Sequence, residues 1–122
     1  MQKFNTKNIV SKFDFTEYQA SRAGSDNLDV LNPYNNELIL SLTSDSLATT
    51  GEKIDRMDLY RKNETNLSIT DRGYLLEKWY LKIMENKNSL GELIVLEQGK
   101  PLSEAISEVE YGGAFIKWYS EE

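Results

Sequence analysis

The side chains best suited to chemistry lie in the last quarter of this sequence. Glu104 and Glu108 stand four residues apart, so they share one face of a helix. Two such carboxylates can divide acid and base roles when burial separates their pKa values. Nothing nearby in the sequence forces their burial, so we interpret them as a solvated face.

The segment 97–101, Glu-Gln-Gly-Lys-Pro, combines an acid, a glycine and a lysine. We interpret it as a junction, because glycine commonly ends one helix and proline commonly opens the next. Lys100 would then lie near the carbonyl groups at the end of the first of these helices. We therefore predict no catalytic, cofactor-binding or metal-ligating residue within this sequence.

Two absent residue types exclude more chemistry than the charge does. The 122-residue chain contains no cysteine and no histidine, so it offers no thiolate nucleophile, disulfide, imidazole base, or thiolate or imidazole metal ligand. Its 14 basic and 20 acidic side chains give a net charge of −6, which disfavours binding to a nucleic-acid backbone. No run approaches the ~20 apolar residues of a membrane span, and the amino terminus lacks the apolar core of a secretory signal. We predict a cytoplasmic protein that binds neither nucleic acid nor membrane.

A single α+β domain, mainly helical, must position any site, because the length is that of one typical domain. Residues 1–27 are polar and weakly periodic, and we treat them as a variable amino-terminal segment that forms a short helix, a short strand or neither. Residues 28–42 predict a β-hairpin, because two apolar runs flank a segment dense in turn residues. Pro33 suits the first turn position, and Asn35 and Asn36 tolerate a left-handed backbone. A lone hairpin is marginal in water, so it must pack on helices or further strands.

About four helices follow the hairpin. Ser44 or Asp45 caps a first helix, which runs towards Arg61 and is interrupted by Gly51. Its apolar stripe consists of Leu47, Ile54, Met57 and Tyr60. A second helix begins at a capping box, Ser68 to Asp71. Its apolar residues recur at spacings of three and four; they are Leu75, Leu76, Trp79, Tyr80, Ile83 and Met84.

The last two helices meet at the junction described above. The third helix carries Leu90, Leu93, Ile94 and Val95 and ends at Gly99. The fourth begins after Pro101 and continues to Tyr119 or Ser120. One of its faces consists of Leu102, Ala105, Ile106, Val109, Gly113 and Ile116. The sequence ends on two acids with no glycine or proline stop, which opposes the helix dipole, so we expect this helix to continue further.

An aromatic stripe lies on the fourth helix at spacings of three and four. It consists of Tyr111, Phe115, Trp118 and Tyr119. Packing in the core is the usual explanation for such a stripe, and we expect it here.

The stretch from Leu75 to Glu122 resembles the amino-terminal part of the aldehyde dehydrogenases, in particular the succinate-semialdehyde dehydrogenase branch. The strongest element is Leu-Glu-Gln-Gly-Lys-Pro-Leu-Ser-Glu-Ala at 96–105. The helix that follows is similar to the branch's E-x-x-Y-A-A-S-F-x-E-W-F-A-E-E segment, in register at Glu108, Tyr111, Phe115, Trp118, Glu121 and Glu122. Upstream, Asn32-Pro33 is similar to the family's hairpin turn, so the resemblance covers residues 28–122. The chain departs from the family in its first helix, which lacks the usual alanines, and at Gly112 and Gly113, where alanines are usual.

The resemblance implies an incomplete piece of the aldehyde dehydrogenase fold, without a complete Rossmann domain. In the intact enzymes a cysteine attacks the aldehyde, hydride passes to NAD+ or NADP+, and a glutamate-activated water releases the acid. Those parts would lie beyond Glu122, so we expect this chain alone to be inactive and to bind neither cofactor. The resemblance also implies that the last helix borders the aldehyde entrance, with Tyr111 or Phe115 as an apolar wall of the substrate tunnel. Other residues would anchor the carboxylate of a semialdehyde, because this helix offers no arginine.

A second interpretation is a free-standing helical protein-interaction module derived from the same fold. The two hypotheses differ over the face formed by Leu102, Ile106, Val109 and Ile116. A module would bury that face within its own fold, whereas a fragment would leave it exposed. For the fragment we predict self-association through exposed helix faces.

Overall fold

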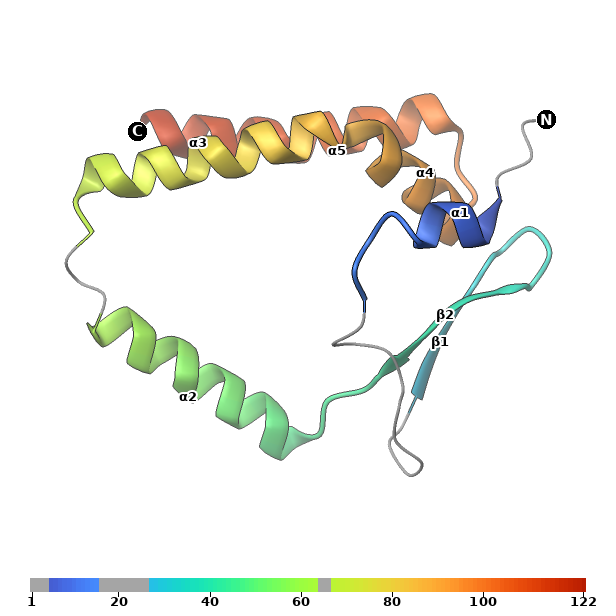
Figure 1. Ribbon diagram of the computed structural model, residues 1–122, viewed down its shortest axis with the longest axis horizontal. Helices are drawn as coiled ribbons and strands as arrows, with labels where there is room; N and C mark the ends of the chain where they lie inside the picture. The colour runs from blue at the N-terminus through green and yellow to red at the C-terminus, as the bar shows by residue number, and fades with distance from the viewer. Residues whose placement is uncertain (1–4, 16–26, 64–66) are drawn as a thin grey trace.

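The computed structural model describes residues 5–15, 27–63 and 67–122. The elements in these ranges are α1 (Thr6–Val10), β1 (Asn27–Leu31), β2 (Leu38–Thr43), α2 (Leu47–Asn63), α3 (Ile69–Glu85), α4 (Lys87–Gln98) and α5 (Leu102–Glu121). Helices α3, α4 and α5 lie together, α1 lies between α4 and the hairpin, and α2 stands apart (Figure 1). The predicted mainly helical α+β fold is confirmed, and the described part of the variable segment includes the short helix α1.

The hairpin forms where the sequence predicts it. β1 and β2 are antiparallel, with Val30 opposite Leu40 and a bulge between Val30 and Leu31. In the turn, the Asn32 amide donates to the Glu37 carbonyl at 2.9 Å. Asn36 has a φ of 58°, the left-handed conformation that asparagine tolerates. The turn residues therefore set the register of the two strands.

The tip of the hairpin lies against the α4–α5 junction. Gly99 ends α4 with a φ of 71°, as predicted. A Cβ atom placed on Gly99 would lie 3.0 Å from Cγ of Pro33. Glycine is therefore needed here both for its backbone conformation and for the space it leaves to the proline ring.

The predicted capping box at the start of α3 is confirmed. The Ser68 side chain accepts a hydrogen bond from the Asp71 amide at 3.1 Å, and the Asp71 carboxylate accepts one from the Ser68 amide at 3.2 Å. The Ser68 hydroxyl also donates to the Asp71 carboxylate at 2.6 Å. This bond, followed by the one from the Ser68 amide, lowers the pKa of Asp71 below its usual value. Two amide donors that the helix itself leaves unpaired are thus satisfied locally.

Helix α5 packs against α3 and α4 through small residues. Ala105 is fully buried, and Gly113 is buried beside Tyr80 and Met84 of α3. A Cβ atom on Gly91 of α4 would lie 2.8 Å from Cγ1 of Ile106. These close approaches bring the three helices together, so glycine at these positions has a packing role.

Helix α2 differs from the prediction at its start and along its length. It begins at Leu47, and the hydroxyl of Ser46, rather than of Ser44 or the carboxylate of Asp45, accepts a hydrogen bond from the Thr49 amide at 3.1 Å. The helix continues through Gly51, since a single glycine costs a helix only ~1 kcal/mol. No residue of α2 is buried. No helix among the described residues has the length and apolar character needed to cross a membrane.

Candidate functional site

The outer face of α5, which we define as Tyr111, Phe115 and Trp118, is the most distinctive surface of the described chain. Their exposed fractions are 69%, 52% and 53%. Tyr119, beside this face, is 61% exposed. The expectation that the aromatic stripe packs in the core is therefore wrong: the small residues on the other side of α5 allow a closer approach to α3 and α4, so that side is the one buried.

The rings of the outer face are ordered against each other. Tyr111 and Phe115 meet edge to face, with centroids 5.0 Å apart and an angle of 85°. Trp118 and Tyr119 meet at 4.8 Å and 76°. Such pairs gain about 0.5–1.5 kcal/mol beyond area burial. The two rings expected as a tunnel wall thus form one continuous apolar surface.

Ion pairs join the flank of α5 to α3 and α4. Lys117 contacts Glu77 of α3 and Glu121, both at 3.0 Å. The hydrogen bond to Glu77, followed by that to Glu121, raises the pKa of Lys117 above its usual value. Glu110 contacts Lys87 at the start of α4 at 2.5 Å. These pairs lie on the flank of α5, away from the aromatic rings.

The two acids at the start of α5 lie on a solvated face, as the sequence indicates. Glu104 and Glu108 are both exposed. Glu108 pairs with the Lys100 ammonium group, so Lys100 contacts a carboxylate instead of the α4 carbonyls expected from the sequence. Glu104 forms no ion pair with any residue that the structure describes. The junction interpretation of 97–101 is confirmed by the left-handed Gly99 and the start of α5 at Leu102.

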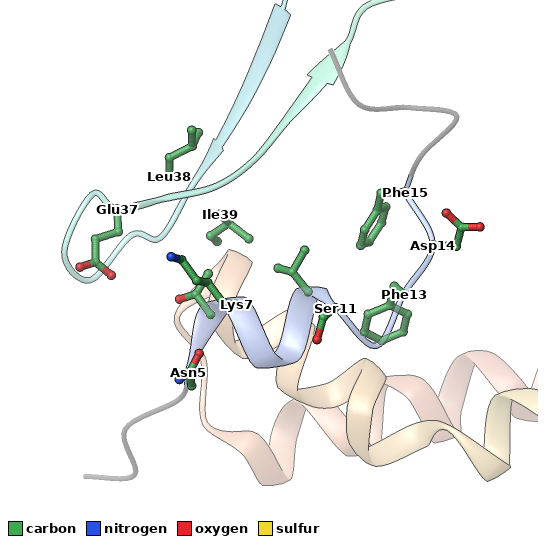
Figure 2. Close-up of a pocket in the computed structure, with 11 residues that line it drawn as sticks. Asn5, Lys7, Ser11, Phe13, Asp14, Phe15, Glu37, Leu38 and Ile39 are labelled. Atoms are coloured by element: carbon green, nitrogen blue, oxygen red, sulfur yellow. The ribbon is translucent and has the colours of Figure 1, made fainter. Parts of the chain in front are cut away.

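Two grooves were missed by the sequence analysis. One, of about 870 Å³, lies between α1, the segment Phe13–Phe15 and the start of β2 (Figure 2). The other, of about 850 Å³, lies between the start of α3 and the end of α5 and includes Trp79 and Tyr119. Both join elements distant in sequence, so periodicity within one element gave no signal for them. No group of three or more acidic side chains that could hold a metal ion occurs in the described ranges.

Comparison with known proteins decides the family. The model of the aldehyde dehydrogenase family matches residues 18–122. The chain belongs to the aldehyde dehydrogenase family.

Several relatives of this aldehyde dehydrogenase chain are succinate-semialdehyde dehydrogenases, the branch that the sequence resembles, and others are glutarate-semialdehyde dehydrogenases. It is 38% identical over 95 residues to the mitochondrial succinate-semialdehyde dehydrogenase of Arabidopsis thaliana, covering 78% of this chain and 18% of the relative. It is 35% identical over 95 residues to the NADP+ succinate-semialdehyde dehydrogenase GabD of Escherichia coli K12, covering 78% and 20%. The crystal structure of an aldehyde dehydrogenase from Brucella melitensis biovar abortus 2308 matches with a TM-score of 0.77 and 34% identity, over 80% of this chain and 20% of that chain.

The chain thus spans about a fifth of the length of these aldehyde dehydrogenases. Its solvent-exposed area is also larger than that of a compact protein of the same mass. It exposes 9713 Å², whereas a compact 14.0 kDa monomer exposes about 6,700 Å². The excess is about 3,000 Å². Among the described residues, the aromatic side of α5 is exposed and no residue of α2 is buried.

The turn from Gly99 into α5 does not suit the pyrophosphate of a dinucleotide. Helix amino termini bind phosphates, and this turn opens the longest helix among the described residues. There the ring of Pro33 lies against Gly99, Glu104 adds a negative charge to the first turn, and the Lys100 ammonium is paired with Glu108. We therefore derive no catalytic step through a cofactor bound to this part of the chain.

Proposed function

We propose that this chain supplies the hairpin and helical scaffold of an NAD(P)+-dependent semialdehyde dehydrogenase. The enzyme that contains it would oxidise a small aldehyde, with succinate semialdehyde the favoured substrate, to the carboxylate. The observation that supports this proposal most directly is the outer face of α5, an ordered apolar surface on a helix with a dense family resemblance. In the intact enzyme Tyr111 and Phe115 would form part of the aldehyde tunnel wall.

The chemistry of α5 supports a wall and not an anchor. The Ser107 hydroxyl donates to the Ser103 carbonyl at 2.9 Å, so its proton is used within the helix. The only cation of α5, Lys117, is held by Glu77 and Glu121. A wall of this kind excludes water and orients an aldehyde by shape. The rest of the enzyme would supply the carboxylate anchor, the nucleophile and the base.

We further propose that the chain alone is inactive and that the enzyme containing it acts in the cytoplasm. Its sequence contains no cysteine to attack an aldehyde. NAD+ or NADP+ would supply the hydride acceptor only in the complete enzyme, and the choice between them would lie outside this chain.

A chimeric enzyme tests this proposal. Residues 28–122 would replace the corresponding segment of the E. coli relative, and reduction of NADP+ with succinate semialdehyde would be followed. We expect the chimera to be active and the 122-residue chain alone to show neither turnover nor cofactor binding by calorimetry. In the chimera, Tyr111→Ala and Phe115→Ala should each lower kcat/KM for the aldehyde about three- to tenfold, with little change in KM for NADP+.

Tyr34→Ala is the matched control, since it truncates an exposed aromatic ring in the hairpin turn. It should leave kcat/KM unchanged. A folded chimera without activity, or equal losses from all three substitutions, would overturn the assignment of the tunnel wall.

A second candidate is the interaction module, and one observation favours it. The face that distinguishes the two hypotheses is packed within the chain: Leu102, Ile106, Val109 and Ile116 are half-buried around the fully buried Ala105. The expectation that a fragment leaves this face exposed therefore does not hold for α5. Purified chain that captures a specific partner without affecting dehydrogenase activity would favour the module.

A further inference from the structure

Helix α2 has an exposed ridge that matches the outer face of α5. Residues seven apart lie nearly above one another on a helix, with a drift of about 20°. Leu47, Ile54 and Arg61 form such a ridge on α2. Leu47 is 95% exposed, Ile54 is 61% exposed, and the Arg61 side chain is 75% exposed. No other helix or strand of the described residues packs extensively against α2.

The outer face of α5 continues into an acidic end with the same spacing. Glu104, Tyr111 and Trp118 are also seven apart, and all three are exposed. One ridge therefore ends in a cation and the other in an anion, with apolar side chains along the rest of both.

We propose that, in the 122-residue chain on its own, α2 of one copy docks antiparallel on the outer face of α5 of a second copy. The antiparallel direction places unlike charges together and apolar residues together. The opposed pairs are Arg61 with Glu104, Ile54 with Tyr111, and Leu47 with Trp118. Phe115 then falls opposite Thr50 and Gly51, where a Cβ atom on Gly51 would meet nothing within 4 Å. The small residues leave room for the ring.

Charge and buried area both favour α2 of a second copy as the partner of the outer face of α5. Two α5 helices could not pair with each other, because their acidic ends repel: residues 101–122 carry five acids and one lysine. Helix α2 ends in Arg61 and Lys62, which pair with Asp58 within the helix and would complement those acids across the interface. A stable interface buries about 800 Å² on each partner, well within the excess surface. A two-fold dimer would contain the α2–α5 contact twice.

Charge reversal tests the docking in the intact chain by sedimentation equilibrium. We expect a concentration-dependent dimer. Arg61→Glu or Glu104→Lys should each weaken it about tenfold, since two pairs per dimer become repulsive. The double variant should return to within about threefold of the original affinity. Arg56→Glu is the matched control: it makes the same charge change on the opposite side of α2 and should have little effect.

Introduced cysteines test the register, because the sequence has none of its own. A mixture of Ile54→Cys chains and Tyr111→Cys chains should form disulfide-linked heterodimers on mild oxidation. Arg56→Cys in place of Ile54→Cys should not. Circular dichroism confirms that each variant keeps its helices, and α2 variants have no buried contact to lose.

Three results would overturn the proposal. The first is a monomer at millimolar concentration, and the second is a dimer that ignores both charge reversals. The third is a chain carrying Ile54→Cys and Tyr111→Cys together that forms its disulfide internally as a monomer. The proposal does not rest on the enzyme function, so an inactive chimera would leave it standing.

Discussion

Helices α2 and α5 have similar lengths, yet different interactions hold them. α2 has local support: Ser46 caps its start, and Asp58 pairs with Lys62 at 2.5 Å and with Arg61 at 2.8 Å. These partners, Lys62 first, lower the pKa of Asp58. α5 lacks a side-chain cap at Pro101 but buries Ala105 and Gly113 between two other helices. Short isolated helices are marginal in water, so the contrast shows that α5 depends on tertiary packing and α2 on local bonds.

The strongest way to break this comparison is to place a carboxylate on each helix. Ile106→Asp puts a charge against Gly91 of α4 and should cost about 3 kcal/mol of unfolding free energy or more. Ile54→Asp makes the same change on the exposed α2 and should cost under about 0.5 kcal/mol. Chemical denaturation followed by circular dichroism measures both. Equal losses would mean that α2 is as tightly packed as α5.

Two glycine-to-alanine substitutions should change the unfolding free energy in opposite directions, because one glycine is packed against another helix and the other is not. Gly91→Ala places its methyl group 2.8 Å from Cγ1 and 3.3 Å from the backbone nitrogen of Ile106. It should cost about 1–3 kcal/mol through overpacking. Gly112→Ala meets nothing within 4 Å and should gain about 0.5–1 kcal/mol in helix propensity. Melting temperatures report both, and a gain from Gly91→Ala would refute the close α4–α5 contact.

Removing the cap of α3 should have a smaller effect. Ser68→Ala deletes the acceptor for the Asp71 amide and should cost about 1 kcal/mol. Ser68→Thr keeps a hydroxyl that can accept from the Asp71 amide and donate to the Asp71 carboxylate. This control should recover most of the stability in thermal unfolding. An unchanged melting temperature in Ser68→Ala would show that the capping box does not stabilise α3.

The smallest effect concerns the pH dependence of the α3–α5 ion pairs. The pKa of Lys117 is raised in the folded chain by Glu77 and Glu121. Its contribution is therefore present below the usual lysine pKa of about 10.4 and is lost as the pH rises through the folded value. Melting temperatures measured up to about pH 11.5 should fall less steeply for Lys117→Met than for the original chain. Equal alkaline slopes would contradict the role of this pair.

Turns and helix caps could be predicted from the sequence, whereas the face of a helix that is buried could not. The hairpin turn, the Ser68 cap and the left-handed Gly99 each depend on neighbouring residues, and all were predicted. The aromatic stripe of α5 was placed in the core because spacing identifies an apolar stripe without saying what covers it. Residue volume determines which face of α5 is buried. Ala105 and Gly113 allow the neighbouring helices to approach closely, whereas Tyr111 and Phe115 would hold them apart. The partner of Lys100 depends on how the chain turns between α4 and α5. The two grooves depend on contacts between segments distant in sequence, and periodicity within one helix reports neither.

The contact between Pro33 and Gly99 has a consequence for the order of folding. It joins two segments that are further apart in sequence than Glu77 and Lys117, which join α3 and α5 across 40 residues. Closing the longer loop costs more entropy before the contact is gained, so we expect the three helices to assemble first and the hairpin tip to dock late. A substitution at Pro33 should therefore speed unfolding while leaving the folding rate nearly unchanged.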